Sequence, residues 1–321
     1  ASNYLFSRNH SIPYSMIGFF IGWLRYYYKI ELLTAALNVY INNNEKMSNI
    51  KEYIKSQGIE IKGIKFGKSK AQYFMDKREN AIYQGIASIK YCNATIAEEL
   101  YDLSKNKYDN FVDLLSDIVM KTSVDDRQLH ILVTLNFFSM FGKNKYLLSI
   151  IDIYNLLGKC KTLKKDKIQS LNINENDVKK CAEKETAKQY NNVDKDMLVK
   201  LIAVNFENKA LSIKEQVLYE QEYLGNITYK NPKAPDDMYY VVECKFYKDK
   251  TKPYLYLYNL KTGEYLKTKI TAGKAFAETP FKEGNVIHVK EFGERNKMKK
   301  VGGDWVRTDE KEKVVKKWDV Y

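Results

Sequence analysis

The sequence has few residues of the kinds that build disulfide frameworks or metal centres: only 4 cysteines and 3 histidines among 321 residues. The spacing of Cys92, Cys160, Cys181 and Cys244 matches neither a zinc ribbon nor a Cys-x-x-Cys redox pair. Such a small number is also insufficient to staple a chain of this length with disulfides. We therefore expect reduced, mostly buried thiols, no metal site and no cofactor within this chain.

The sequence also lacks a long hydrophobic run. The longest one, Met16–Leu24, is followed by Arg25 and is far shorter than the roughly 20 residues that span a bilayer. It predicts a buried helix and no membrane partner. Because no signal-peptide pattern precedes it, we expect a cytoplasmic protein. The chain begins with Ala1 in place of methionine, from which we expect a fragment of a longer protein.

Positive charge is what the sequence does have in excess. The formal net charge is +13, with +5 in residues 1–100, +3 in residues 101–200 and +5 in residues 201–321. A positive charge spread along the chain suits a polyanionic partner, because each lysine or arginine that neutralises a phosphate releases a condensed counterion. Nucleic acid is the first partner to consider. Simple solubilisation by surface lysines is the alternative that charge alone leaves open.

The spacing of apolar residues divides the chain into a helical part and a β part. Helical periodicity covers residues 11–40, 45–57 and 86–154, and short β-prone pieces in residues 59–84 indicate a small hairpin. Residues 159–211 are polar, with a weaker apolar face that we interpret as linking helices. Beyond residue 236 the pattern changes to five or more short strands with turn signals, which predicts a small antiparallel barrel. The fold class is thus multidomain, α then β.

A polar cluster lies near the N-terminus, in residues 6–11. It combines Arg8 and His10 with small polar side chains, and Tyr14 follows in the predicted helix. Side chains of these types suit an anion such as a triphosphate at a helix N-terminus, where free N–H groups and the helix dipole add to the side-chain donors. A simple helix cap beside a surface arginine is the alternative reading.

A row of tyrosines marks one predicted strand of the barrel. Tyr254, Tyr256 and Tyr258 alternate with leucines, so three rings are expected on one face of the strand. Aromatic rows of this kind stack on unpaired bases, and Lys267 and Lys269 are among the nearby lysines that supply positive charge. The alternative is an amphipathic strand whose tyrosines pack against a neighbouring element.

Several motifs in the same order resemble the fingers-to-tail region of bacterial replicative C-family DNA polymerases. Residues 3–15 resemble the family's F-N-[KR]-S-H-A-x-x-Y segment, which Phe6, Arg8, His10 and Tyr14 match. The other resembling segments are residues 23–37, 46–61, 82–90, 108–114, 127–138 and 220–225. Together they cover nearly the whole chain in the family's order, and it is this order that makes the resemblance persuasive.

The resemblance implies a domain plan and a set of contacts. The expected regions are fingers-domain helices in 1–80, a helix-hairpin-helix-like region in 81–158, linking helices in 159–235 and an OB-fold-like β-barrel in 236–321. Arg8, His10 and Tyr14 are then expected to bind the incoming dNTP, with Arg8 and His10 at its phosphates. Lys90 and Asn93 are expected at DNA, although residues 92–95 replace the hairpin glycines that usually admit a phosphate. Whether this hairpin binds duplex or only packs is left open.

The resemblance also implies which chemistry lies elsewhere. In the family, the palm domain that precedes the fingers carries the carboxylates and the Mg²⁺ ions of nucleotidyl transfer, so no catalytic residue is expected here. The expected partners are single-stranded template and primer-template duplex, with a sliding clamp as a further candidate through residues 169–173. The competing hypothesis is a stand-alone, non-enzymatic single-stranded DNA-binding or scaffold protein.

Overall fold

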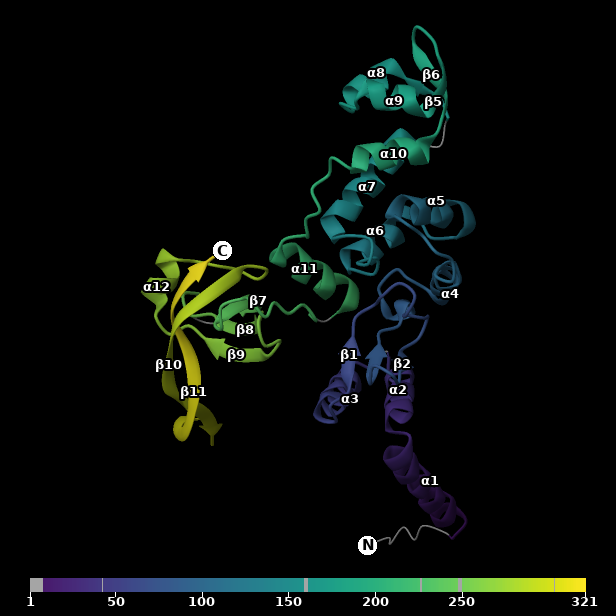
Figure 1. Cartoon of the computed structure of the whole chain (residues 1–321). Helices are drawn as coiled ribbons and strands as arrows, with labels where there is room; N and C mark the ends of the chain where they lie inside the picture. The colour runs from purple at the N-terminus through teal and green to yellow at the C-terminus, as the bar shows by residue number, and fades with distance from the viewer. Residues whose placement is uncertain (1–7, 42, 159–160, 226, 248–249, 303) are drawn as a thin grey trace. The chain divides into compact units, whose positions relative to one another are not determined.

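The computed structural model describes residues 8–41, 43–158, 161–225, 227–247, 250–302 and 304–321. Two compact units make up the chain, Ala1–Lys209 and Ala210–Tyr321. The first unit is mainly helical and the second is built around a five-stranded antiparallel sheet (Figure 1). The predicted order, helices first and strands later, is confirmed.

The first unit begins with three helices and a small sheet. Their bounds are α1 Arg8–Tyr27, α2 Lys29–Val39, α3 Asn44–Ser56, β1 Glu60–Lys62, β2 Phe74–Asp76 and β3 Ala81–Tyr83. β2 and β3 form the predicted hairpin, and β1 joins β3 in parallel, which sequence spacing did not indicate. Leu37 of α2 and Ile54 of α3 are fully buried against Ile82 of β3, so the two helices cover this sheet.

The prediction that residues 16–24 form a buried helix is half wrong. The segment is helical within α1, yet Phe19 is 71% exposed, Phe20 55% and Ile21 49%. Helical spacing of apolar residues defines a face, but it does not supply a surface that covers the face. None of the described helices is long and apolar enough to cross a membrane.

Residues 86–157 form the short helices that their periodicity predicts. The bounds are η1 Ile86–Ser88, α4 Ala94–Leu103, α5 Phe111–Lys121, α6 Asp126–Thr134 and α7 Asn144–Leu157. Asn93, Asn110 and Asp125 each cap a helix N-terminus through the side-chain oxygen, which accepts a backbone N–H of the first turn. Phe66 packs on Phe137 and Phe138 in the buried interior of this region.

Residues 161–209 are more than the linking helices that we predicted. They contain β4 Leu163–Lys164, α8 Lys165–Ser170, α9 Glu175–Cys181, β5 Ala182–Glu185, β6 Gln189–Val193 and α10 Lys195–Ala203. The three strands form a sheet in the order β4-β6-β5. Its centre is the fully buried Tyr190, whose hydroxyl donates to Glu175 at 2.5 Å. The strands are short and their outward residues polar, so their pattern was too weak to detect.

The second unit contains α11 Ile213–Leu224, β7 Met238–Lys245, β8 Tyr254–Asn259, β9 Tyr265–Lys269, α12 Gly273–Glu278, β10 Val286–Val301 and β11 Asp304–Val320. The strand order is β11-β10-β7-β8-β9. One side of the sheet holds a core that includes Val241, Leu257 and Ile287. The opposite side is covered in part by Val217 of α11 and by Ile227.

The unit therefore starts at Ala210, whereas the sequence placed its boundary near residue 236. The reason lies in α11 and the segment after it, which pack on the sheet and share its second core. The polar composition and the prolines of this stretch indicated a linker, but Val217 is fully buried and Ile227 nearly so.

The two outer strands of this sheet also meet. Ile270, just after β9, forms a parallel bridge with Val315 of β11. The Thr268 hydroxyl donates to the carbonyl of Lys313 at 2.8 Å, and Lys269 pairs with Glu312. The strands at the two ends of the sheet order, β11 and β9, are therefore in contact with each other.

Candidate nucleic-acid interface

The outer face of β8 presents tyrosines, as its alternation predicts. Leu255 and Leu257 point into the inner core and are buried. On the other side, Tyr254 is 48% exposed and Tyr256 is half-buried. Successive residues of a strand point to opposite faces, so this division follows directly from the sequence.

The register with β9 extends this face by one strand. Tyr256 pairs with Lys267 and Tyr258 pairs with Tyr265 across the antiparallel ladder. The rings of Tyr256 and Tyr265 stack with centroids 5.0 Å apart and planes 15° from parallel. Tyr265, which is 42% exposed, was not singled out by the sequence analysis. Its position two residues before Lys267, in the next alternating strand, is the signal that could have found it.

A further ring lies at the open end of the face. Tyr247 is 68% exposed and meets Tyr254 edge to face at 5.1 Å. Burial raises the pKa of Tyr256 and Tyr265, so both phenols are neutral at physiological pH. Together Tyr247, Tyr254, Tyr256 and Tyr265 form an aromatic surface, here called the tyrosine face.

The two lysines predicted beside the tyrosines have different surroundings. Lys267 is exposed, and its ammonium lies 5.7 Å from the centre of the Tyr256 ring. Lys269 also approaches a ring, that of Tyr254 at 5.2 Å, but its side chain is only 11% exposed and pairs with Glu312. Arg295 reaches the same carboxylate at 3.0 Å. Lys269 therefore ties β9 to β11, and Lys267 is the cation of the two that faces solvent.

Tyr258 does not belong to the exposed row, which corrects the prediction of three presented rings. It is 1% exposed, and it packs with Val217 and Ile227 in the core beneath α11. Its hydroxyl donates to the carbonyl of Tyr229 at 3.0 Å. The alternation put its side chain on the correct face of β8, but α11 and the following segment cover that end of the face.

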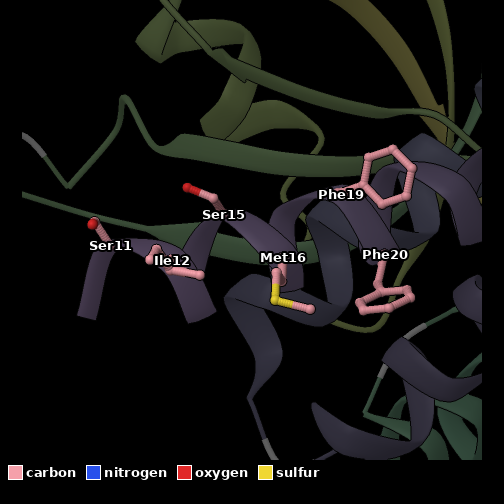
Figure 2. A pocket seen from close by; sticks show the side chains of 6 residues that line it. All are labelled: Ser11, Ile12, Ser15, Met16, Phe19 and Phe20. Atoms are coloured by element: carbon pink, nitrogen blue, oxygen red, sulfur yellow. The ribbon is translucent and has the colours of Figure 1, made fainter. Parts of the chain in front are cut away.

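The residues predicted at a nucleotide lie on α1. Arg8 is the first residue of this helix, and its side chain lies outside the described residues. His10 and Tyr14 are exposed and stand four residues apart, on one face of the helix. A pocket of about 500 Å³ on the same helix is lined by Ser11, Ile12, Ser15, Met16, Phe19 and Phe20, whose side chains are drawn in Figure 2. Residues 8–11 of the polar cluster thus form the start of α1, and residues 6 and 7 lie outside the described residues.

The predicted hairpin contact at Lys90 and Asn93 has a different geometry from a phosphate-binding turn. Asn93 is extended (φ −138°) and caps α4 by accepting the N–H of Ile96 at 3.0 Å. The left-handed residue is Tyr91, at φ +71°. Tyrosine in that conformation is uncommon, and the packing of neighbouring groups fixes it here.

Two cations surround the Tyr91 ring. The Arg127 guanidinium lies 3.3 Å from the ring centre and the Lys90 ammonium 5.0 Å. These cations, Lys90 first, lower the pKa of the Tyr91 phenol. Gln128 also donates to the Tyr91 carbonyl at 3.1 Å, which ties the turn to α6. Arg127 and Lys90 are both exposed, and the sequence analysis singled out only Lys90.

The segment considered for a sliding clamp, residues 169–173, is folded. It ends α8 and closes a turn in which the N–H of Ile173 donates to the carbonyl of Ile168 at 3.0 Å. Asn172 holds the left-handed conformation of this turn, at φ +51°. A clamp contact here stays a prediction. Among the described residues, no group of three or more His, Cys, Asp or Glu side chains is placed to hold a metal ion.

The sequence is similar to bacterial DNA polymerases, the class that its motifs resemble. The relatives that it matches include alpha subunits of DNA polymerase III from several bacteria. The chain is 27% identical over 154 residues to that subunit from Bacillus subtilis, which covers 47% of this chain and 14% of the relative. It is 24% identical over 148 residues to the subunit from Ureaplasma parvum, covering 46% and 15%.

A longer match is found with the alpha subunit from Treponema pallidum, at 24% identity over 186 residues, or 57% of this chain and 16% of the relative. The chain thus matches about one seventh of the length of these curated relatives, and the match covers about half of the chain rather than nearly all of it. No protein-family model matches the chain.

Proposed function

We propose that this chain is a DNA-binding portion of a replicative polymerase of the DNA polymerase III alpha type. It holds single-stranded template and primer-template duplex during DNA replication, and α1 contributes to the site of the incoming dNTP. The relationship to the alpha subunit supports the polymerase context. In this proposal nucleotidyl transfer and its Mg²⁺ ions belong to residues that the chain does not contain.

The second unit is, in this proposal, an OB-like barrel. Its five strands follow the sequence of an OB fold: a three-stranded meander β7-β8-β9, a helix, and a hairpin β10-β11 whose first strand pairs with β7. The parallel bridge between Ile270 and Val315 supports closure between β9 and β11. OB folds bind oligonucleotides on the face of their second and third strands, which correspond to β8 and β9.

The tyrosine face is the single observation that carries the proposal. Tyr254, Tyr256 and Tyr265 are aromatic rings on those two strands, and Lys267 supplies positive charge beside them. Unpaired bases stack on such rings, each contributing about 1 to 3 kcal/mol, while lysines attract the phosphates between them. Stacking does not require a particular base, so this face binds single strands with little sequence preference.

The remaining predicted contacts belong to the polymerase context. Arg8, His10 and Tyr14 bind the phosphates of the incoming dNTP at the first turns of α1. Lys90 and Arg127 contact a duplex backbone near the Tyr91 turn, with Asn93 holding α4 in place beside them. In the intact polymerase, loss of Arg8 or His10 raises the dNTP requirement and leaves DNA affinity nearly unchanged.

The test of the proposal is fluorescence anisotropy of labelled oligothymidylate with the full chain. Tyr256→Ala should weaken binding by about 5- to 150-fold, the range expected for one lost base stack. The matched control is Tyr321→Ala, which removes a tyrosine that is 66% exposed in the same unit but away from β8 and β9. Equal affinities for the wild type and Tyr256→Ala would refute the proposal.

A further inference from the structure

A second surface of the same unit, Ala210–Tyr321, is lined by carboxylates, whereas the tyrosine face has a lysine beside it. It is a groove of about 620 Å³ between α11, β7 and the loop before β10, lined by Glu215, Leu218, Tyr219, Gln221, Glu222, Tyr240, Glu283 and Gly284. We call it the α11 groove. Its volume lies within the range of ligand pockets, which run from about 300 to 1,000 Å³.

The lining combines apolar surface with negative charge. Leu218 is 42% exposed and lies beside Tyr219, and the Tyr240 ring is buried beneath them. Three carboxylates, those of Glu215, Glu222 and Glu283, line the groove, and no described lysine, arginine or histidine is among its lining residues. This is unusual in a chain of net charge +13. A surface that is acidic at its edge and apolar at its floor does not suit a nucleic acid, because phosphates are repelled there.

The negative charge of Glu283 also acts on two ionisable groups of β7. Glu283 contributes, after burial, to raising the pKa of the Tyr240 phenol, and it acts in the same direction on the Cys244 thiol. The carboxylate of Glu215 is held in place by the N-terminal capping box of α11, where it accepts from the backbone N–H of Ser212 at 2.8 Å. Glu222 and Glu283 are both exposed to solvent.

The groove is preformed because α11 is anchored on two sides. Glu220 is buried, and its carboxylate accepts the backbone N–H groups of Thr228 and Tyr229 at 2.6 and 2.7 Å. On the groove side, the Tyr240 hydroxyl donates to the side-chain oxygen of Gln221 at 3.2 Å. Gly284 lies in the wall near Tyr240 and Leu218, and its backbone has φ +83°, a conformation that other residues rarely adopt. A preformed site avoids the entropy cost of ordering on binding.

We propose that the α11 groove docks a cationic segment of a partner protein, in which lysine or arginine side chains alternate with aliphatic ones. The aliphatic side chain packs on Leu218 and Tyr219, and the cations pair with Glu222 and Glu283. Charge complementarity selects this occupant over nucleic acid and over an acidic or wholly apolar peptide. The inference goes beyond the proposed function, since it concerns a protein partner at a surface that the tyrosine face does not include.

The test uses a fluorescein-labelled peptide of alternating lysine and leucine as the probe, titrated with the full chain. The same peptide with glutamate in place of lysine is the matched probe control. We expect the lysine peptide to bind and the glutamate peptide to show no measurable binding. The double variant Glu222→Lys with Glu283→Lys should weaken binding of the lysine peptide by about tenfold or more.

Two further variants distinguish binding in the groove from general attraction between opposite charges. The reversal pair Glu278→Lys with Asp309→Lys changes the net charge by the same amount at exposed positions outside the groove, and should change affinity less than about twofold. Leu218→Ser keeps every charge and should weaken binding about fivefold, including at high salt, because the contact it removes is apolar. Equal losses of affinity for the lysine peptide from both reversal pairs, or no loss of that affinity from Leu218→Ser, would overturn the inference.

The outcome is separable from that of the proposed function. Oligothymidylate binding should be unchanged by Leu218→Ser, since that residue is not on β8 or β9. Binding of the lysine peptide without binding of oligothymidylate would uphold this inference and refute the proposed function. Binding of oligothymidylate together with failure of the lysine peptide would do the reverse.

Discussion

Tyr256 and Tyr258 stand two residues apart on the same side of β8, yet they have opposite surroundings. Tyr256 is half-buried and stacked on Tyr265, whereas Tyr258 is 1% exposed and hydrogen-bonded to Tyr229. The residue type and the alternation are identical. The difference comes from α11, which covers one end of the strand and leaves the other end open.

The comparison shows how one helix can divide a single sheet face between stability and binding. Beneath α11 a tyrosine fills a core, and beyond it a tyrosine forms part of the tyrosine face. The buried Glu220 holds this arrangement, because its carboxylate fixes the segment whose carbonyl accepts the Tyr258 hydroxyl. The same helix also forms one wall of the acidic α11 groove.

The largest expected effect separates the two tyrosines by stability. Tyr258→Ala should lower the free energy of unfolding by about 3 to 5 kcal/mol, the usual cost of truncating a large buried aromatic residue. Tyr254→Ala, at a 48% exposed position of the same strand, should lower it by less than about 1 kcal/mol. Urea denaturation of the two variants measures the difference. A similar loss of unfolding free energy in both variants would contradict the difference between the covered and the open end of β8.

The next largest effect distinguishes Tyr256 from Tyr258 by the affinity of the chain for oligothymidylate. Tyr256→Ala should reduce the affinity for oligothymidylate by about 1 to 3 kcal/mol, because one base loses its stacking partner. Tyr258→Phe keeps the buried ring and should leave that affinity unchanged. Anisotropy titrations at one salt concentration provide the measurement, with circular dichroism as the check that both variants are folded. A loss of affinity in Tyr258→Phe would mean that the buried ring takes part in binding.

Lys267 and Lys269 of β9 likewise distinguish a residue that contributes to binding from one that contributes to stability. Lys269→Met should cost about 1.5 kcal/mol of stability, because Glu312 loses one of its two cations in a partly buried setting. Lys267→Met should leave stability unchanged and lower the salt dependence of single-strand binding by about 0.7 in the log–log slope. Denaturation and a salt series check the pair. The account fails if Lys269→Met changes the salt slope and Lys267→Met does not.

The smallest effect concerns pH. Burial, with added repulsion from Tyr265 and Glu220, raises the pKa of the Tyr258 phenol well above its usual value of about 10. The folded chain therefore keeps this proton at pH values where the unfolded chain loses it. The stability from this group is complete below about pH 10 and is lost as pH rises further.

Tyr258→Phe should accordingly cost about 1 kcal/mol at neutral pH, the value of one hydrogen bond, and should flatten the fall of stability above about pH 10. Denaturation midpoints of the variant and the wild type across alkaline pH test this expectation. An unchanged alkaline slope would assign the fall in stability to other groups.

Much of the fold could be predicted from the sequence because strong local signals agree with it. The helices of residues 94–157 have clear apolar periodicity together with Asn and Asp caps, and the later strands alternate between turn signals. Non-local features could not be predicted in this way. The parallel pairing of β1 with β3, the small sheet around Tyr190 and the exposure of α1 all depend on what distant segments pack against.

The candidate site was partly predictable for the same reason. Alternation placed Tyr254 and Tyr256 correctly on the outer face of β8. It could not show that α11 covers Tyr258, that Glu312 engages Lys269, or that Tyr265 stacks on Tyr256 from the next strand. These depend on register and on tertiary contacts, which a period of two residues does not encode.

The central claim is that the tyrosine face and its lysine form a surface for single-stranded DNA. Its most direct test is fluorescence anisotropy of the full chain on single-stranded and on duplex DNA across a salt series, with Tyr256→Ala alongside the wild type. The account predicts micromolar or tighter single-strand binding with a steep negative log-salt slope, weakened by Tyr256→Ala. No single-strand binding at low salt, or binding that Tyr256→Ala leaves unchanged, would contradict it.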